Sequence, residues 1–326
     1  MENKRLGGNP PETSIVPSTE ITQELIPEPT AGLVEKSFAE NTLRNRRQAL
    51  KQFDEWLRGR PIADGLLAQY ITDLFDEGKA PGTISIAVSA VKWLLKYRNN
   101  GKPVELPITA ATLAGIRREG RDRGRGQRNG LTWREVEKIC AVQEADGTLR
   151  GTRNSAILRV MSDGLLRISE VVELRIDDLE DNTLRVRHSK TDQEGQGEYL
   201  YLCTDTRQMV GKWLERSGLM EGYLFRRMTA RGDNLYVNKN TGEPFALTAD
   251  GVRKIIKQSA AKVGLTEKVS GHSLRIGTTV SLAESGASLV DIQTAGRWKD
   301  PGMPAHYTRA QFVERGAIAR FKDGKR

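Results

Sequence analysis

One short segment combines two cationic side chains with the start of a predicted helix. In GHSLRIGTTVSLAESG, His272 and Arg275 stand three residues apart, a spacing that places both side chains on one helix face. The N-terminus is the positive end of the helix dipole, so two cations there are unfavourable unless an anion binds beside them. The pair therefore indicates a site for an anion.

A second unusual residue is Arg167, which lies inside the apolar run MSDGLLRISEVVEL with Glu170 three residues later. A guanidinium group among apolar side chains needs a partner, because burying an unpaired charge is costly. A salt bridge to Glu170 would meet that need. The residues alone favour this structural explanation and leave a functional role for Arg167 open.

Searches for other catalytic motifs are negative. The chain has no GxxxxGK[ST] phosphate loop, no GxGxxG after a strand, no HExxH and no GxSxG. These absences argue against ATP-driven and nicotinamide-dependent chemistry. The acidic group Asp177, Asp178, Glu180 and Asp181 could be imagined as a divalent-metal site, but acids before a hairpin more often form a solvated turn, and we expect the turn.

The composition predicts an ordered protein with a polyanionic partner. The chain has 326 residues, of which 37% are hydrophobic; this supplies cores for one large domain or two ordinary ones and excludes full disorder. Lys and Arg number 51 against 42 Asp and Glu, a net charge of +9, which makes nucleic acid the first candidate. Residues 1–34 form a predicted disordered tail with a charge of −3, so the remainder carries +12.

The sequence gives no sign of secretion or membrane insertion. Cys140 and Cys203 lack the spacing of a disulfide framework or a zinc site. The first residues lack the apolar core of a signal peptide, and the most apolar stretch, 83–95, is too short to span a bilayer. We expect a cytoplasmic protein with no membrane contact.

Helical periodicity predicts two domains joined by a basic linker. Apolar residues recur at helical spacing through 35–118, after a possible capping box of Ser37 and Glu40, and predict a small helical bundle. Residues 119–130, EGRDRGRGQRNG, contain no apolar side chain and alternate Gly with Arg. Such a composition is typical of an exposed flexible connector, so we place the domain boundary there.

Residues 131–326 form the second predicted domain. Alternating patterns at 183–188 and 198–202 predict two strands joined by a turn, and everything after residue 202 is expected to be helical. Side-chain caps and periodicity predict helices at 132–143, 151–163, 168–175, 205–216, 248–263, 273–285 and 288–296, with caps at Thr132, Thr248 and Ser288.

Five ordered motifs resemble a known family. GLLRISEVVELRIDDL, HSK, GHSLR, AGRWKDPGMPAHYTR and ERGAIARFKDG together are similar to the catalytic domain of the tyrosine recombinase (phage integrase) family, most closely to its Cre-type members. The bundle at 35–118 resembles the family's core-binding domain. The resemblance implies a mainly α fold arranged as a two-domain, C-shaped DNA clamp, with a small antiparallel sheet in the catalytic domain.

The resemblance also implies roles for the residues. Tyr307 would attack the scissile phosphorus of DNA and form a 3′-phosphotyrosine. Arg167 and Arg275 would each donate two hydrogen bonds to the non-bridging oxygens, which gain negative charge in the transition state. Lys190, at the turn between the strands, would protonate the departing 5′-oxygen.

The remaining catalytic positions follow in the same way. His272 would lie beside the phosphate as a donor or proton acceptor, and Glu170 would hold the neighbouring groups. Trp298 stands where many family members have His, and its indole N–H can donate a hydrogen bond but cannot exchange protons. The resemblance implies no cofactor and no metal.

The family's partner is double-stranded DNA with inverted-repeat target sites. The resemblance implies a homodimer on one site, a homotetramer in the synapse, a Holliday junction intermediate and a protein associated with the nucleoid or a plasmid. A terminal helix at 314–325 would dock into a neighbouring subunit or pack on its own domain. Basic residues expected to touch DNA, mostly at phosphates, are Arg44, Arg47, Lys92, Arg153, Arg253 and Lys254.

Two other functions remain open at this point. A type IB topoisomerase would use similar phosphate chemistry as a monomer. A DNA-binding regulator could retain the fold with a vestigial catalytic set, although the complete set from Arg167 to Tyr307 speaks against decay.

Overall fold

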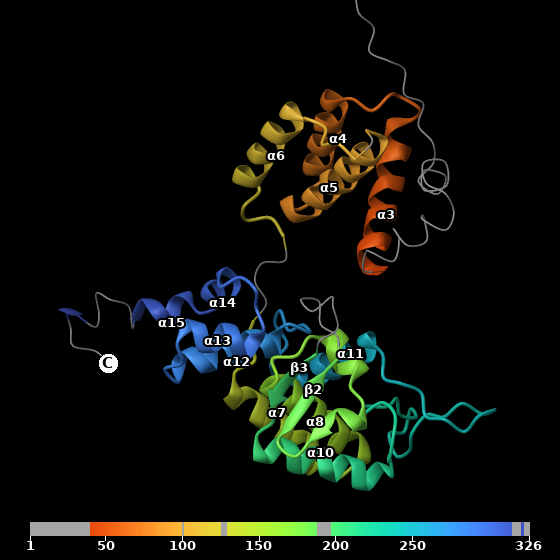
Figure 1. Cartoon of the computed structure of the whole chain (residues 1–326), viewed down its shortest axis with the longest axis vertical. Coiled ribbons are helices and arrows are strands. Elements are labelled where there is room, and N and C mark those ends of the chain that lie inside the picture. Colours follow the sequence, from red (N-terminus) through yellow and green to blue (C-terminus); the bar gives the residue numbers. More distant parts are fainter. Residues whose placement is uncertain (1–39, 100, 125–128, 188–196, 315–320, 323–326) are drawn as a thin grey trace, which may run out of the picture. The chain divides into compact units, whose positions relative to one another are not determined.

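The computed structural model describes residues 40–99, 101–124, 129–187, 197–314 and 321–322. The chain divides into two compact units, Met1–Gly126 and Gln127–Arg326 (Figure 1). The border between them lies within the range 119–130. Helices form most of the described residues, and one small antiparallel sheet lies in the second unit, so the expected mainly α fold with a small sheet is confirmed.

The first unit is a bundle of helices around an apolar core. Its described helices are α3 (Glu40–Leu57), α4 (Asp64–Asp76), α5 (Pro81–Arg98) and α6 (Pro107–Glu119). Proline begins both α5 and α6, where its missing N–H costs no helical hydrogen bond. Phe53, Leu67 and Ile71 are among the side chains of the core. This burial explains why the apolar stripes were readable in the sequence.

The second unit contains a larger set of helices. They are α7 (Trp133–Ala145), α8 (Leu149–Asp163), α9 (Ile168–Glu173), α10 (Thr204–Ser217), α11 (Ala249–Ala261), α12 (Ser273–Glu284), α13 (Leu289–Gly296), α14 (Gly302–Tyr307) and α15 (Arg309–Glu314). The predicted caps are present: Thr248 and Ser288 accept hydrogen bonds from the third residue of their helices, and Thr132 forms a capping box with Glu135. Local side-chain bonds thus fix three of these helix starts.

The sheet has the strand order β1-β2-β3 and is antiparallel throughout. Its strands are β1 (Leu179–Glu180), β2 (Thr183–Val186) and β3 (Glu198–Tyr201), with Leu184 opposite Leu200 in the β2–β3 register. The buried faces of β2 and β3 pack into the core, while Tyr199 and Tyr201 are exposed. The two predicted strands are present, and β1 is an addition that the sequence did not reveal.

The stretch between α10 and α11 corrects the expectation that everything after residue 202 is helical. Isolated antiparallel bridges join Arg226 to Ala246, Met228 to Leu235 and Val237 to Pro244. The segment is the extended excursion at the right of Figure 1. These pairings connect residues up to twenty positions apart, so helical periodicity could not predict them.

Asp177, Glu180 and Asp181 before the hairpin are exposed, as expected of a solvated turn, whereas Asp178 is not. Asp178 is 2% exposed and pairs through Oδ1 with Nε of Arg187, while Asp177 contacts Nη2 of the same arginine at 3.0 Å. Residues Ile176–Asp178 form a short 3₁₀ helix. The two carboxylates therefore bind an arginine and tie β2 to the segment before β1.

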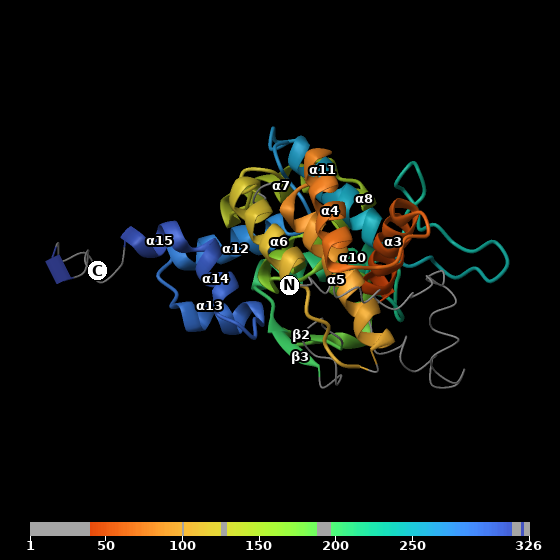
Figure 2. The ribbon, with the colours of Figure 1, turned by 90° about the horizontal axis from the view of Figure 1, so that it is seen from above.

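Helices α12, α13, α14 and α15 pack together at one side of the second unit, as both views show (Figures 1 and 2). The chain enters this unit directly against α12. The backbone N–H of Leu131 donates to the carbonyl of Ser273 at 2.8 Å, and a Cβ at Gly277 would overlap the Leu131 backbone. Glycine at 277 therefore permits the entering segment to lie on the helix that carries Arg275.

Within the described ranges, no helix combines the length and apolar character needed to cross a membrane.

Candidate active site

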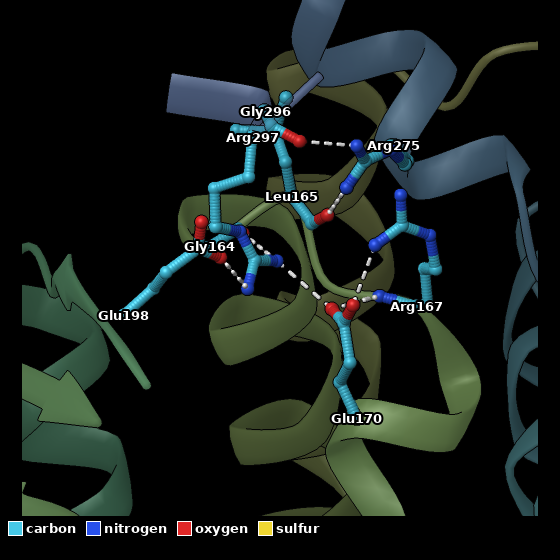
Figure 3. A network of polar contacts seen from close by, with 8 residues as sticks. All are labelled: Gly164, Leu165, Arg167, Glu170, Glu198, Arg275, Gly296 and Arg297. Atoms are coloured by element: carbon cyan, nitrogen blue, oxygen red, sulfur yellow. Dashed lines mark hydrogen bonds and ion pairs between the residues drawn. The ribbon is translucent and has the colours of Figure 1, made fainter. Parts of the chain in front are cut away.

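Arg167 and Glu170 form one side of a charged cluster in the second unit (Figure 3). Arg167 is the residue before α9, and the Glu170 carboxylate accepts its backbone N–H at 2.9 Å and its Nη1 at 2.6 Å. The expected salt bridge is therefore present. The carboxylate side chain is 2% exposed and the Arg167 side chain 18% exposed, so part of the guanidinium faces outward.

Arg275 lies on the other side of the cluster, in the first turn of α12. Its side chain is buried and donates to the carbonyl oxygens of Leu165 and Gly296. Two of its five N–H groups are used in this way, which leaves donors for a ligand. Burial, followed by repulsion from Arg167, lowers the pKa of Arg275 to about 9. A bound anion would oppose that shift.

Trp298 and Tyr307 extend the cluster from the segment after α13. The Arg275 guanidinium lies 4.0 Å from the centre of the Trp298 ring, a cation–π contact. The Trp298 and Tyr307 ring centres are 6.4 Å apart. Burial raises the pKa of Tyr307 and Arg275 acts in the opposite direction. The hydroxyl therefore belongs to a partly buried tyrosine beside a cation.

His272 occupies the position immediately before α12, as the sequence predicted. Its side chain is exposed, and its backbone N–H donates to Oγ of Ser270 at 3.3 Å. The residue lies one helical turn before Arg275. The structure thus brings together Arg167, Glu170, Arg275, Trp298 and Tyr307, with His272 at the end of the same helix as Arg275. Lys190 lies outside the described residues.

Arg297 belongs to the cluster and was missed in the sequence. Its Nη2 donates to Oε2 of Glu170 at 2.8 Å, and its Nη1 lies 3.6 Å from a carboxylate oxygen of Glu198. Its backbone is left-handed, with φ 56°, a conformation that usually marks glycine at a helix end. The helix predicted at 288–296 ends where α13 ends, but the residue pattern gave no reason to single out the arginine that follows it.

The proposed DNA-contact residues differ in their exposure. Arg44, Arg47, Lys92, Arg253 and Lys254 are exposed. Arg153, which was also expected to touch DNA, is instead 6% exposed and donates to the Asn154 side chain at 2.9 Å and to the Arg226 carbonyl at 3.1 Å. Burial lowers its pKa to about 10. The Arg226 carbonyl belongs to the stretch between α10 and α11, whose extended structure the sequence did not predict.

The chemistry that this arrangement can perform follows from its charges. Arg167 and Arg297 bind the buried Glu170 carboxylate and Arg275 lies nearby, so the cluster has excess positive charge next to a phenolic hydroxyl. Fixed guanidinium groups can stabilise negative charge that develops on phosphate oxygens. Among the described residues, no group of three or more His, Cys, Asp or Glu side chains could hold a metal ion.

A tyrosine beside such a cluster defines a class of site suited to phosphoryl transfer. The model of the phage integrase family matches residues 129–314 of this chain. This range includes every member of the cluster and more than half of the sequence. The chain belongs to the phage integrase (tyrosine recombinase) family, as the sequence motifs predicted.

Several relatives align with nearly the whole chain. An integrase/recombinase XerD homolog of Selenomonas ruminantium is 28% identical over 309 residues, covering 89% of this chain and 85% of its own length. The Cre recombinase of Escherichia phage P1 is 23% identical over 310 residues, covering 89% of this chain and 90% of its own. These values do not single out Cre, so the Cre-type assignment stays a prediction.

Solved structures of similar fold include recombinases bound to DNA. The XerH site-specific recombinase bound to a palindromic difH substrate has a TM-score of 0.65 at 18% identity, covering 91% of this chain and 84% of its own. A lambda integrase dimer bound to a COC′ core site has a TM-score of 0.61 at 17% identity, covering 90% of this chain and 77% of its own. The similarity supports the fold assignment.

Proposed function

We propose that the chain is a site-specific DNA recombinase that cleaves and rejoins DNA through a covalent tyrosine intermediate. The observation that carries this proposal is the position of Tyr307 beside Trp298 and Arg275 in a member of the phage integrase family. A vestigial DNA-binding protein would have no need to retain this arrangement.

The proposed reaction is a transesterification. The Tyr307 hydroxyl oxygen attacks the scissile phosphorus, a bond forms between them, and the bond from phosphorus to the 5′-oxygen breaks. Lys190 donates a proton to the leaving oxygen, and the tyrosine proton passes to His272 or to solvent. One phosphoester replaces another, so resealing by the reverse reaction needs neither ATP nor a metal ion.

Positive charge would stabilise the transition state of this step. The phosphorus becomes five-coordinate and its non-bridging oxygens gain negative charge. Arg167 and Arg275 keep N–H donors that their intramolecular contacts leave unused, and these donors can bind both oxygens. Trp298 can add an indole N–H but no proton transfer. Glu170 holds Arg167 in place.

The DNA complex follows from the same proposal. Residues 35–118 would act as the core-binding domain, 119–130 as the linker and 131–326 as the catalytic domain, which together clamp the duplex. Two chains would occupy the inverted repeats of one site and four would form the synapse, with the segment 314–325 docking into a neighbour. The exposed Arg44, Arg47, Lys92, Arg253 and Lys254 would bind phosphates.

The decisive experiment traps the covalent intermediate. The purified chain is incubated with fragments of its native replicon, and protein-linked DNA ends are mapped to give the target. Tyr307→Phe should bind the mapped half-site and form no adduct, because the nucleophilic oxygen is gone. Tyr201→Phe is the matched control, since this tyrosine is 60% exposed in β3. Adducts that persist in Tyr307→Phe would contradict the proposal.

The mapped site also separates recombination from relaxation. A plasmid carrying two target sites should yield recombinant products with this chain alone if it acts as a Cre-type enzyme. A requirement for a second recombinase would contradict the Cre-type assignment. Relaxation of a plasmid that lacks the target would support a type IB topoisomerase and contradict site-specific recombination.

A further inference from the structure

Arg297 occupies a backbone position at which an arginine is energetically unfavourable. Its φ of 56° and ψ of 45° lie in the left-handed region at the end of α13. A side chain with a Cβ costs about 1 kcal/mol or more there relative to glycine. The side-chain contacts of Arg297 must therefore compensate for the strain or serve the site that surrounds it.

The side chain of Arg297 completes the binding of one carboxylate. Glu170 accepts Nη1 of Arg167 at Oε1, while its Oε2 accepts the Arg167 backbone N–H and Nη2 of Arg297. Arg297 and Glu170 side chains are 5% and 2% exposed. Burial would raise the pKa of Glu170, but attraction to Arg297, together with the bonds from Arg167, lowers it below its usual value. The carboxylate is thus held as an anion between two guanidinium groups.

The backbone of Arg297 serves the other arginine of the site. The preceding carbonyl, of Gly296, accepts from Arg275, and the following ring, of Trp298, lies against the same guanidinium. Figure 3 shows the Arg297 side chain extending from beside Gly296 toward Glu170. Arg297 therefore supports Arg167 through its side chain, while its two neighbours in the chain contact Arg275.

We propose that Arg297 is a positioning residue of the phosphate-binding arginines: its guanidinium orients Glu170, and through Glu170 it fixes Arg167 at the distance from Arg275 that the scissile phosphate requires. The inference rests on the proposed DNA cleavage, and it assigns to Arg297 no contact with DNA. Removing the side chain should misplace Arg167 while leaving the fold and the nucleophile intact.

Arg297→Gly is the informative variant, because glycine keeps the left-handed turn without strain and removes only the side chain. Adduct formation on the mapped half-site should slow by about 10- to 100-fold, the cost expected for a misplaced catalytic group. Half-site affinity should change by less than about twofold. Arg297→Lys keeps the positive charge but lacks the paired N–H donors of the guanidinium, and it should recover part of the cleavage rate.

Arg58→Gly is the matched control. Arg58 is also an arginine with a left-handed backbone, φ 50°, and it lies exposed in the first unit. Its replacement relieves the same kind of strain and removes the same charge, and the cleavage rate should remain that of the parent chain.

A second DNA substrate distinguishes a role of Arg297 in positioning the phosphate-binding arginines from a general loss of structure in Arg297→Gly. A methylphosphonate at the scissile position replaces one charged non-bridging oxygen with a methyl group and lowers the need for Arg167. The reduction in the rate of adduct formation that Arg297→Gly causes should be severalfold smaller on this substrate than on the ordinary phosphate. An equal loss on both substrates, or an unchanged rate on the ordinary phosphate, would overturn the proposal. Adduct formation by the parent chain, absent in Tyr307→Phe, tests the proposed function separately.

Discussion

The two units differ in the kind of side chain that they bury. Within the described residues, Thr109 is the one buried polar side chain of the first unit, and it accompanies a core of aliphatic and aromatic groups. The second unit buries Arg153, Glu170, Asp178 and Arg275, together with many hydroxyl groups. Buried charges need partners supplied by several elements, whereas apolar packing needs only shape and pattern.

This difference indicates a division of labour. None of the described charged side chains of the first unit is fully buried, so the phosphate contacts proposed for this unit would carry little cost of burial. The second unit holds charges inside, where a low local dielectric strengthens their action on a bound anion. Charge pairing should therefore contribute to the stability of the second unit, in addition to its apolar core, and much less to that of the first unit.

The largest expected effect on stability comes from Phe53→Ala. Phe53 is 1% exposed and packs on Tyr70, with ring centres 5.0 Å apart. Truncation should lower the stability of the first unit by about 3–5 kcal/mol. Hydrogen exchange should show lost protection in 40–119 and retained protection in 129–314. Ile86→Ala, at a half-exposed site on α5, should change stability by less than about 0.5 kcal/mol. Simultaneous loss of protection in both units would break the comparison.

Arg275→Lys tests the charged interior of the second unit. Lysine cannot donate to the carbonyls of Leu165 and Gly296 and also form a bidentate pair of hydrogen bonds to phosphate. Adduct formation should fall by about 10²- to 10³-fold, as for the loss of a preorganised donor. Half-site binding should persist in a gel-shift assay. A near-normal cleavage rate in Arg275→Lys would show that the Arg275 guanidinium does not bind the scissile phosphate.

The pH dependence of Glu170 gives a smaller and more specific effect. Its folded-state pKa is lowered, so its stabilising contribution is complete above the unfolded value near ~4.3 and is lost as pH falls through the folded value. The stability difference between the parent chain and Glu170→Gln should therefore shrink at acid pH, by at most about 1.4 kcal/mol per pH unit. Urea unfolding from pH 7 downward measures it. A difference independent of pH would show that Glu170 is not held as an anion.

The smallest expected effect sharpens the contrast between surface and interior arginines. Arg44→Gln should lower the slope of log affinity against log salt by about 1, because one phosphate contact is lost. Arg153→Gln should leave that slope unchanged and reduce stability, since Arg153 binds Asn154 and the Arg226 carbonyl. A changed salt slope for Arg153→Gln would mean that its side chain leaves the interior when DNA binds.

Local interactions were predictable from the sequence. The caps at Thr132, Thr248 and Ser288 involve residues three positions away, and the Arg167–Glu170 pair spans the same distance. Such contacts depend on short-range geometry that residue spacing specifies. The apolar stripes of the first unit were equally readable, because their period matches that of the helix.

Interactions between distant segments were not predictable in this way. Arg153 meets a carbonyl 73 positions away, and Arg297 meets a carboxylate 127 positions away. No periodicity connects such residues, so the burial of Arg153 could not be predicted and Arg297 escaped notice. The bridges between α10 and α11 also join residues that lie up to twenty positions apart in the sequence, so no local pattern predicts them. Family motifs located Arg167, Arg275, Tyr307 and Glu170, but not Arg297, which binds Glu170 from another part of the chain.

The contact between Leu131 and α12 has a mechanical consequence. The linker leads directly into Leu131, whose backbone N–H donates to the Ser273 carbonyl and whose backbone lies against Gly277. Tension in the linker would therefore reach α12, the helix that carries Arg275, through Leu131. A pull that tilts α12 would move the Arg275 guanidinium relative to Arg167.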